Sequence, residues 1–187
     1  MSSPVNTIAE NLSSPLAVIS LGSNLPLQRV SGLQESAAIL RQALRDLQEL
    51  SSEPLVSSSF YRTTPLDSPA AAPDFINAIA LLRPFPNIAA FELLQCLHSI
   101  ETKFGRARDL LANSPRSLDL DLISFGNMQC QEPGLILPHP RALLRRFVMT
   151  PLSEVAPALK LPGQDLTASE QAELLQTLQT SQQIQRL

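Results

Sequence analysis

The sequence predicts an α+β protein with a ferredoxin-like β-α-β-β-α-β core, in which an antiparallel sheet has helices packed on it, plus C-terminal additions. Two stretches with helical spacing of apolar residues, 28–50 and 88–105, alternate with stretches that have the period of two typical of strands. Of the 187 residues, 44% are hydrophobic and 17% are charged, which is enough apolar material for a packed core. We expect a single domain over residues 16–160, a loose leader over 1–15, and a tail or helix over 161–187.

The first strand and the first helix are predicted by two apolar patterns. Residues 16–21 form a short apolar run that ends at Gly22-Ser23-Asn24, which is typical of a buried strand opening into a turn. The helix expected over 28–50 has apolar residues three or four positions apart: Val30, Leu33, Ala37, Leu40, Leu44 and Leu47. The same spacing occurs in coiled coils, but here it covers fewer than three heptads, so packing on the sheet is favoured.

Two further strands are predicted at residues 54–63 and 75–84, where β-branched and aromatic residues alternate with other types. The proline-rich stretch "TPLDSPAAAPD" lies between them. Loops this long inside a compact domain are often functional. We therefore expect neighbouring strands joined by a constrained loop that contributes to a site.

The second half of the chain supplies another helix and another strand. The helix expected over 88–105 has an apolar stripe made by Leu93, Leu97, Ile100 and Phe104. The stretch "RSLDLDLISFG", residues 116–126, predicts the last core strand. Residues 134–157 predict an irregular segment with a short strand and a short helix.

Bulk properties exclude several classes of protein. A net charge of −3 gives no reason to expect nucleic-acid binding, and no apolar run approaches the ~20 residues of a membrane span. The two cysteines, Cys96 and Cys130, lie far apart without CxxC spacing, so neither a disulfide framework nor a zinc site is indicated. The N-terminus lacks the basic and apolar regions of a signal peptide, so we expect a cytoplasmic protein. The expected assembly is a monomer, although no sequence pattern decides it.

Two carboxylates share one face of the strand predicted at 116–126. Asp119 and Asp121 lie two residues apart, and side chains so spaced on a strand point the same way, about 6.6–7 Å apart. The leucines at 118, 120 and 122 point to the other face, under the helices. Two neighbouring carboxylates repel each other unless a cation or an arginine neutralises them, and their oxygens suit Mg²⁺. The alternative is an ordinary solvated sheet face with alternate polar residues.

Arginines are concentrated around this strand. Six of them fall within 41 residues: Arg106, Arg108, Arg116, Arg141, Arg145 and Arg146. Guanidinium groups bind phosphate bidentately, so arginines beside a carboxylate pair have the composition of a metal-assisted phosphoryl-transfer site. The alternative is a solvated basic face. The chain has no GxxxxGK[ST] stretch, which excludes a P-loop as the phosphate cradle.

Three other residue types could complete such a site. His139 lies between two prolines in "LPHPR", a stiff backbone suited to holding a ring in place. Phe75 and Asn77 share a strand face and, with Phe147, could sandwich and read a planar heterocycle. The alternative is that both phenylalanines belong to the core. His98 is expected at a helix surface or the edge of the site.

Seven motifs occur together over residues 17–157: "SLGSNL", "SSFYRTTPL", "DFINAIALL", "IETKFGRAR", "PRSLDLDLISFG", "LPHPR" and "RRFVMTPLSEVAP". In this order and at these spacings they resemble the family of 6-hydroxymethyl-7,8-dihydropterin pyrophosphokinases (HPPK), enzymes of folate biosynthesis. The resemblance implies that ATP donates its β,γ-pyrophosphoryl group to the hydroxymethyl group of the reduced pterin, and that AMP leaves. It also implies two Mg²⁺ ions as cofactors, ATP as co-substrate, and ordered binding with ATP–Mg²⁺ first.

The resemblance assigns roles residue by residue. It implies that Arg106, Arg116, Asp119 and Asp121 are catalytic, and that both aspartates bind the metal ions. The implied ATP-binding residues are Glu101, Arg106, Arg108, Arg116, Leu122, His139 and Arg145. The implied pterin-binding residues are Thr63, Leu66, Phe75, Asn77 and Phe147.

The sequence departs from the family after "GRAR", where some members carry further Lys, Arg or Trp residues in a mobile loop. Here that loop reads "DLLANS", with Arg108 as its cationic member and no basic residue until Arg116. Two other classes stay open on the residues alone. One is a nucleotidyltransferase or nuclease that uses the same carboxylates and arginines, and the other is a non-catalytic ferredoxin-like binding module.

Overall fold

The structure is a computed structural model that describes residues 14–29, 32–64, 73–105, 117–179 and 182–187. The elements in chain order are β1 (Ala17–Ser23), β2 (Leu27–Arg29), β3 (Gly32–Gln34), α1 (Ser36–Gln48), β4 (Val56–Ser57), β5 (Tyr61–Thr63), β6 (Phe75–Leu82), α2 (Ala90–Lys103), β7 (Asp119–Phe125), β8 (Cys130–Glu132), β9 (Leu135–Leu137), the 3₁₀ turn η1 (Ala142–Leu144), α3 (Arg146–Val155), α4 (Ala168–Leu178) and β10 (Ile184–Arg186).

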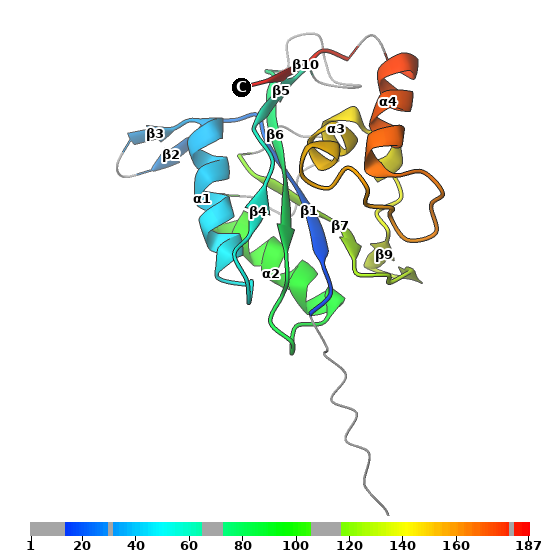
Figure 1. The fold of residues 1–187 in the computed structure, drawn as a ribbon. Coiled ribbons are helices and arrows are strands. Elements are labelled where there is room, and N and C mark those ends of the chain that lie inside the picture. The colour runs from blue at the N-terminus through cyan, green and yellow to red at the C-terminus, as the bar shows by residue number, and fades with distance from the viewer. Residues whose placement is uncertain (1–13, 30–31, 65–72, 106–116, 180–181) are drawn as a thin grey trace, which may run out of the picture.

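A central antiparallel sheet organises the fold (Figure 1). Its strands run in the order β10-β5-β6-β1-β7, and β4 pairs with β6 beside β5. Strand β1 is central, paired with β6 on one side and β7 on the other. The crossovers through α1 and α2 give the ferredoxin-like arrangement that the sequence pattern predicted.

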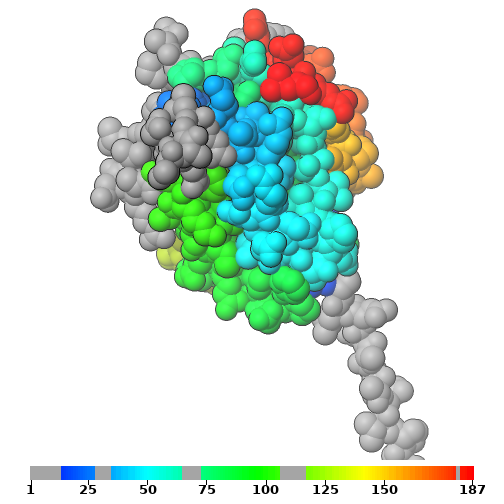
Figure 2. All heavy atoms as spheres, turned by 90° about the vertical axis from the view of Figure 1, so that its left-hand side faces the viewer, coloured from blue at the N-terminus to red at the C-terminus, as the bar shows by residue number. Residues whose placement is uncertain are grey.

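One face of the sheet is covered by α1 and α2, which lie on the same side in Figure 1 and form much of the coloured surface in Figure 2. The predicted stripe of α2 is confirmed, because Leu93, Leu97, Ile100 and Phe104 are all at most 4% exposed. They pack with inward-facing residues of β1, β6 and β7 and with the buried residues of α1 in one apolar cluster. This face therefore contains the main core.

The opposite face is covered in part by α3 and α4, so the molecule has three layers (Figure 1). Val18, Ile79 and Ile123 project from three neighbouring strands into a second apolar cluster with α3. Residue Ile123 is the extra residue of a bulge, since Ile19 pairs with Leu122 and Val18 with Ser124. Ile123 thus lies in this second cluster, whereas its neighbour Leu122 lies in the first.

The predicted boundaries were wrong at two places in the first half of the chain. The helix expected from residue 28 begins at Ser36, and the hairpin β2–β3 precedes it. Gly32, at the start of β3, disfavours helix by about 1 kcal/mol relative to alanine, which helps explain this difference. The strand expected over 54–63 is divided into β4 and β5, because the Ser58 hydroxyl accepts the backbone N–H of Ile79 (2.9 Å) between them.

The C-terminal segment, expected as a tail or helix outside the domain, takes part in the central structure. Helix α4 is present within it, and its N-cap is Thr167, whose side chain accepts from the N–H of Glu170. Strand β10 pairs with β5 and forms one edge of the central sheet. Its polar composition concealed it, because an edge strand needs few apolar residues.

Candidate active site

The candidate site lies on the α3 side of the sheet, where the strand registers bring polar residues into rows. Asn77 of β6 pairs with Gly22 of β1, which pairs in turn with Asp119 of β7. One step along β1, Ser20 pairs with Asp121. Directly paired residues share a face, so these side chains lie on one continuous surface.

The aspartates lie as the period of two predicted. Asp119 and Asp121 are partly exposed, whereas Leu118, Leu120 and Leu122 are at most 4% exposed and belong to the core under α1 and α2. The strand thus divides its residues between packing and a polar surface. Leu122 is placed in the core, on the face opposite the aspartates, so the structure does not bring its side chain together with them.

Arg145, immediately before α3, faces this carboxylate pair. Its Nη1 lies 3.2 Å from Oδ2 of Asp121, and its Cζ lies 5.3 Å from the centroid of the Phe147 ring. Burial lowers the pKa of Arg145, and the nearby charge of Asp121 opposes that shift. An arginine remains charged under such conditions, so this guanidinium is one positive charge available to an anion at the site.

His139 is held beside Asp121 and Arg145 by backbone contacts. Its N–H donates to the carbonyl of Ile123 (2.8 Å), and its Nδ1 accepts from the N–H of Arg141 (3.2 Å). Burial lowers the pKa of His139, with Asp121 acting in the opposite direction. The ring is therefore neutral near pH 7, and an accepting Nδ1 assigns its proton to Nε2.

A polar floor with an aromatic wall lies next to the aspartates. The buried amide of Asn77 donates through Nδ2 to Oγ1 of Thr63 (2.8 Å), which fixes the orientation of both side chains. Phe75 pairs with Thr63 and is partly exposed. A Cβ added to Gly22 would meet Asn77 Oδ1 at 3.3 Å, so the glycine keeps the floor open.

Sequence reasoning missed the role of Gly22. The glycine was read as the start of a turn, but β1 continues through Ser23. A glycine inside a strand often marks a close approach by a ligand or another backbone, and this signal was present in "SLGSNL".

Glu101 is buried against β7. It is 1% exposed, and its Oε1 accepts the N–H of Leu120 at 2.8 Å. It thereby satisfies a backbone donor between the two aspartates. A direct contact of Glu101 with a nucleotide stays a prediction.

Some predicted site residues lie outside the described residues. These are Arg106, Arg108 and Arg116, the loop "DLLANS" between them, and Leu66. His98 is described on α2, where its carbonyl accepts from the Thr102 hydroxyl.

The carboxylate pair fits a metal ion that takes few protein ligands. Among the described residues, no group of three or more His, Cys, Asp or Glu gathers into a metal cluster. Mg²⁺ usually keeps several waters and binds one or two carboxylates together with substrate phosphates. The partly exposed carboxylates of Asp119 and Asp121 match that donor set. The guanidinium of Arg145 already contacts one of them.

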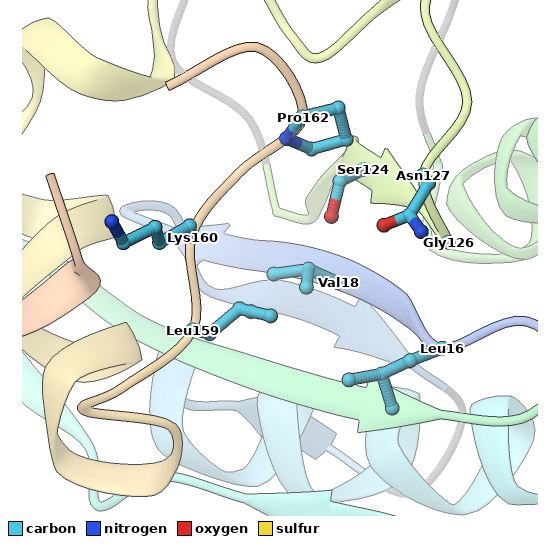
Figure 3. Close-up of a pocket in the computed structure, with 8 residues that line it drawn as sticks. All are labelled: Leu16, Val18, Ser124, Gly126, Asn127, Leu159, Lys160 and Pro162. Atoms are coloured by element: carbon cyan, nitrogen blue, oxygen red, sulfur yellow. The ribbon is translucent and has the colours of Figure 1, made fainter. Parts of the chain in front are cut away.

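A small cavity of about 90 Å³ lies at the other end of β7 (Figure 3). Its lining is Leu16, Val18, Ser124, Gly126, Asn127, Leu159, Lys160 and Pro162. It contains neither a carboxylate nor an arginine, so it does not form part of the site around Asp119.

On one surface of this ferredoxin-like fold, a carboxylate pair and an arginine therefore lie beside a hydrogen-bonding floor with an aromatic wall. The family model for 7,8-dihydro-6-hydroxymethylpterin-pyrophosphokinase (HPPK) matches residues 18–157. The chain belongs to this family, and the predicted identity is confirmed.

Curated relatives agree. Proteins called 2-amino-4-hydroxy-6-hydroxymethyldihydropteridine pyrophosphokinase are 39% identical in Pseudomonas aeruginosa, over 77% of this chain and 82% of that one, and 37% identical in Haemophilus influenzae, over 80% and 87%. A Synechocystis relative of the same name is 46% identical over 54% of this chain, an alignment that spans about half (49%) of the relative.

Solved structures show the same fold. The chain superposes on Plasmodium falciparum HPPK-DHPS with pteroate at a TM-score of 0.67 and 12% identity, covering 90% of this chain and 45% of the other. Within the part of the chain that the structure describes, no helix is both long and apolar enough to cross a membrane.

Proposed function

We propose that this chain carries out the Mg²⁺-dependent transfer of pyrophosphate from ATP to the hydroxymethyl group of 6-hydroxymethyl-7,8-dihydropterin. The products would be AMP and the pterin diphosphate, in folate biosynthesis. Membership of the HPPK family supports this reaction. The observation that carries it is the register Asn77–Gly22–Asp119, which sets a heterocycle-reading floor directly beside the carboxylate pair.

Asp119 and Asp121 would hold the two metal ions. Bound Mg²⁺ would neutralise the charge of the triphosphate and hold it in place. Arg145 would exchange its contact with Asp121 for a phosphate oxygen once the metal neutralises the carboxylates. This exchange costs little, because the side chains of Arg145 and Asp121 are already 18% and 31% exposed.

The pterin would lie on the floor made by Asn77 and Thr63. The amide of Asn77, already fixed by Thr63, can read the donors and acceptors on the edge of the ring. Phe75 and Phe147 would stack on its two faces. Because both aromatics are only partly buried, they have surface available for a ligand.

Catalysis would come from position and charge more than from a base. The neutral His139 can donate from Nε2 to a phosphate oxygen, and Arg145 adds a full positive charge. Holding the pterin hydroxyl in line with the β-phosphorus would supply much of the rate enhancement.

Several finer assignments rest on the resemblance alone. Arg106, Arg108 and Arg116 would hold the triphosphate, and Leu66 would contribute to the pterin pocket. The loops at 64–74 and 106–114 would exclude water, since hydrolysis of ATP is the competing reaction. ATP–Mg²⁺ binding before the pterin, a monomer and a cytoplasmic location also stay predictions.

The deciding experiment is an assay of AMP formation from ATP, with and without 6-hydroxymethyl-7,8-dihydropterin and with and without Mg²⁺. We expect AMP and pterin diphosphate only when all components are present. Release of free pyrophosphate would support a nucleotidyltransferase instead. Pterin binding without turnover would support a binding module.

A further inference from the structure

Arg146 lies between two residues of the site, Arg145 and Phe147, yet its own side chain contacts another part of the molecule. It is 8% exposed, and its Nη1 donates to the carbonyls of Gln179 and Gln182, both at 2.8 Å. Charge-assisted bonds of this kind are stronger than neutral ones. The first turn of α3 is thus fastened to the C-terminal segment.

That segment, residues 182–187, which we call the C-terminal strap, is fastened in turn to β5. The N–H of Thr64 donates to the carbonyl of Gln183 (3.2 Å), and the N–H of Gln183 donates to Oγ1 of Thr64 (3.1 Å). Ile184 pairs with Thr63 in the sheet. Figures 1 and 2 show the red strap at the top of the molecule, and Figure 1 shows its strand beside β5.

A second anchor joins the strap to the far end of α3. Glu154 accepts hydrogen bonds from the hydroxyls of Ser59 (2.8 Å) and Tyr61 (2.9 Å), and from Nη2 of Arg186 (2.8 Å). Burial, together with the bond to Glu154, raises the pKa of Tyr61 to about 12. The strap therefore connects α3 with β5 at two points.

These two elements form opposite sides of the proposed pterin site. Helix α3 carries Phe147, and Arg145 directly precedes it, whereas β5 carries Thr63, which orients Asn77. The distance between the two sides is set by what joins them. The strap is one such connection, and it lies outside residues 18–157 that the family model matches.

We propose that the C-terminal strap is a positioning element of the pterin site, and that Arg146 is the positioning residue through which it sets the first turn of α3. This inference rests on the proposed function for its consequence in catalysis. Its structural part, the fastening of α3 by the strap, can be tested without any activity.

The kinetic test compares Arg146→Met, Arg146→Lys and a chain that ends at Leu178, which removes both carbonyl acceptors of Arg146, with the exposed Arg45→Met of α1 as the matched control. Losing the two charge-assisted bonds should raise the KM for the pterin about tenfold. Lysine keeps the charge and one donor group, so Arg146→Lys should recover part of the loss. Arg45→Met should behave as the wild type.

The double variant makes the test specific. If Arg146 acts through the strap, Arg146→Met should add little in the chain that ends at Leu178, because both changes break the same connection. The proposal would be overturned if the increases in pterin KM of the two changes multiplied in the double variant. A lower kcat with an unchanged pterin KM would also overturn it, since simple loss of folded protein changes kcat alone.

Hydrogen exchange supplies the readout that is independent of activity. The amides of Val148 and Met149, which donate to the carbonyl of Arg145, should exchange about tenfold faster in Arg146→Met and in the shortened chain. Unchanged exchange would refute the strap whatever the enzyme does. A wild-type protein without pterin-dependent AMP formation would refute the proposed function and leave this test standing.

Discussion

The two faces of the central sheet are built from the same strands but differ in what they bury. The face under α1 and α2 is apolar along most of its length, and its residues on β1, for example Ala17, Ile19 and Leu21, are fully buried. The face toward α3 changes character along the strands. Val18 lies in the second apolar cluster, whereas Ser20 and Gly22 lie in the candidate site.

This change occurs in three neighbouring strands. On β7 it falls between Ile123 and Asp121, as far along the sheet as on β1. On β6 it falls between Ile79 and Asn77, one pair further along, because Ile79 pairs with Ser20. The candidate site therefore begins where the second apolar cluster ends. One face of the sheet serves stability along its whole length, and the other divides its length between stability and function.

The largest expected effect is a loss of activity, and it comes from the candidate site on the sheet face toward α3. Asp119→Asn keeps the shape of the side chain but removes its charge, so we expect kcat/KM to fall by at least ~10³-fold, on the scale of a lost electrostatic stabiliser. Circular dichroism and the melting temperature should stay near wild type. The exposed Asp165→Asn is the control and should keep full activity. A near-wild-type rate in Asp119→Asn would refute the metal assignment.

Adjacent residues of β7 allow the two faces to be compared directly. Leu120→Ala opens a cavity under the helices, so we expect the free energy of unfolding to fall by about 2–5 kcal/mol, while folded molecules keep their KM values. Asp121→Asn should do the reverse. It should impair catalysis but change the free energy of unfolding by less than about 1 kcal/mol, because its ion pair with Arg145 is partly exposed.

Urea unfolding and steady-state kinetics on the same preparations check both outcomes. If Leu120→Ala changed the pterin KM, or if Asp121→Asn unfolded the protein, the strict division between the faces would be wrong.

The sequence predicted this division wherever a period was strong. The alternation in "LDLDL" assigned both aspartates to one face, and the three- and four-residue spacing assigned the stripe of α2. Both are local properties of the backbone geometry. Pairing between distant strands is not local, so the adjacency of Asn77, Gly22 and Asp119 could not be derived from spacing, although the family resemblance assigned Asn77 and Asp119 to one active site.

The errors have the same physical origin. The apolar residues at 30 and 33 continued the spacing of α1, but the chain pairs as the hairpin β2–β3 there. The strand β10 is short, polar and at an edge, and its place depends on hydrogen bonds to β5 and on Arg146. A residue such as Arg146, whose partners are carbonyls more than 30 positions away, leaves no periodic signal.

A smaller effect is expected on the floor of the site. Asn77→Ala removes the amide proposed to hydrogen-bond the pterin, a loss of about 1–3 kcal/mol of binding free energy or roughly 5- to 150-fold in pterin KM. The matched control is Asn127→Ala beside the small cavity at the other end of β7. Isothermal calorimetry with the enzyme–nucleotide complex should show the same ratio. Equal losses in the two variants would mean that the floor does not read the pterin.

The smallest expected effect concerns the pKa of His139, whose ring lies beside Asp121 and Arg145 in the candidate site. Burial lowers its pKa, so the ring in the folded protein should titrate below the ~6.5 of an unfolded chain. A lowered histidine pKa contributes stability that is present above ~6.5 and is lost as the pH falls toward the folded value. Proton NMR of the two histidines, assigned with His139→Gln, measures it.

The same titration tests the coupling between His139 and the carboxylate pair. The charge of Asp121 raises the pKa of His139 against the effect of burial, so Asp121→Asn should lower that pKa further. A pKa of His139 at or above ~6.5, or one that Asp121→Asn leaves unchanged, would show that the ring is not held against the carboxylates. The neutral donor proposed for the phosphate would then have to be abandoned.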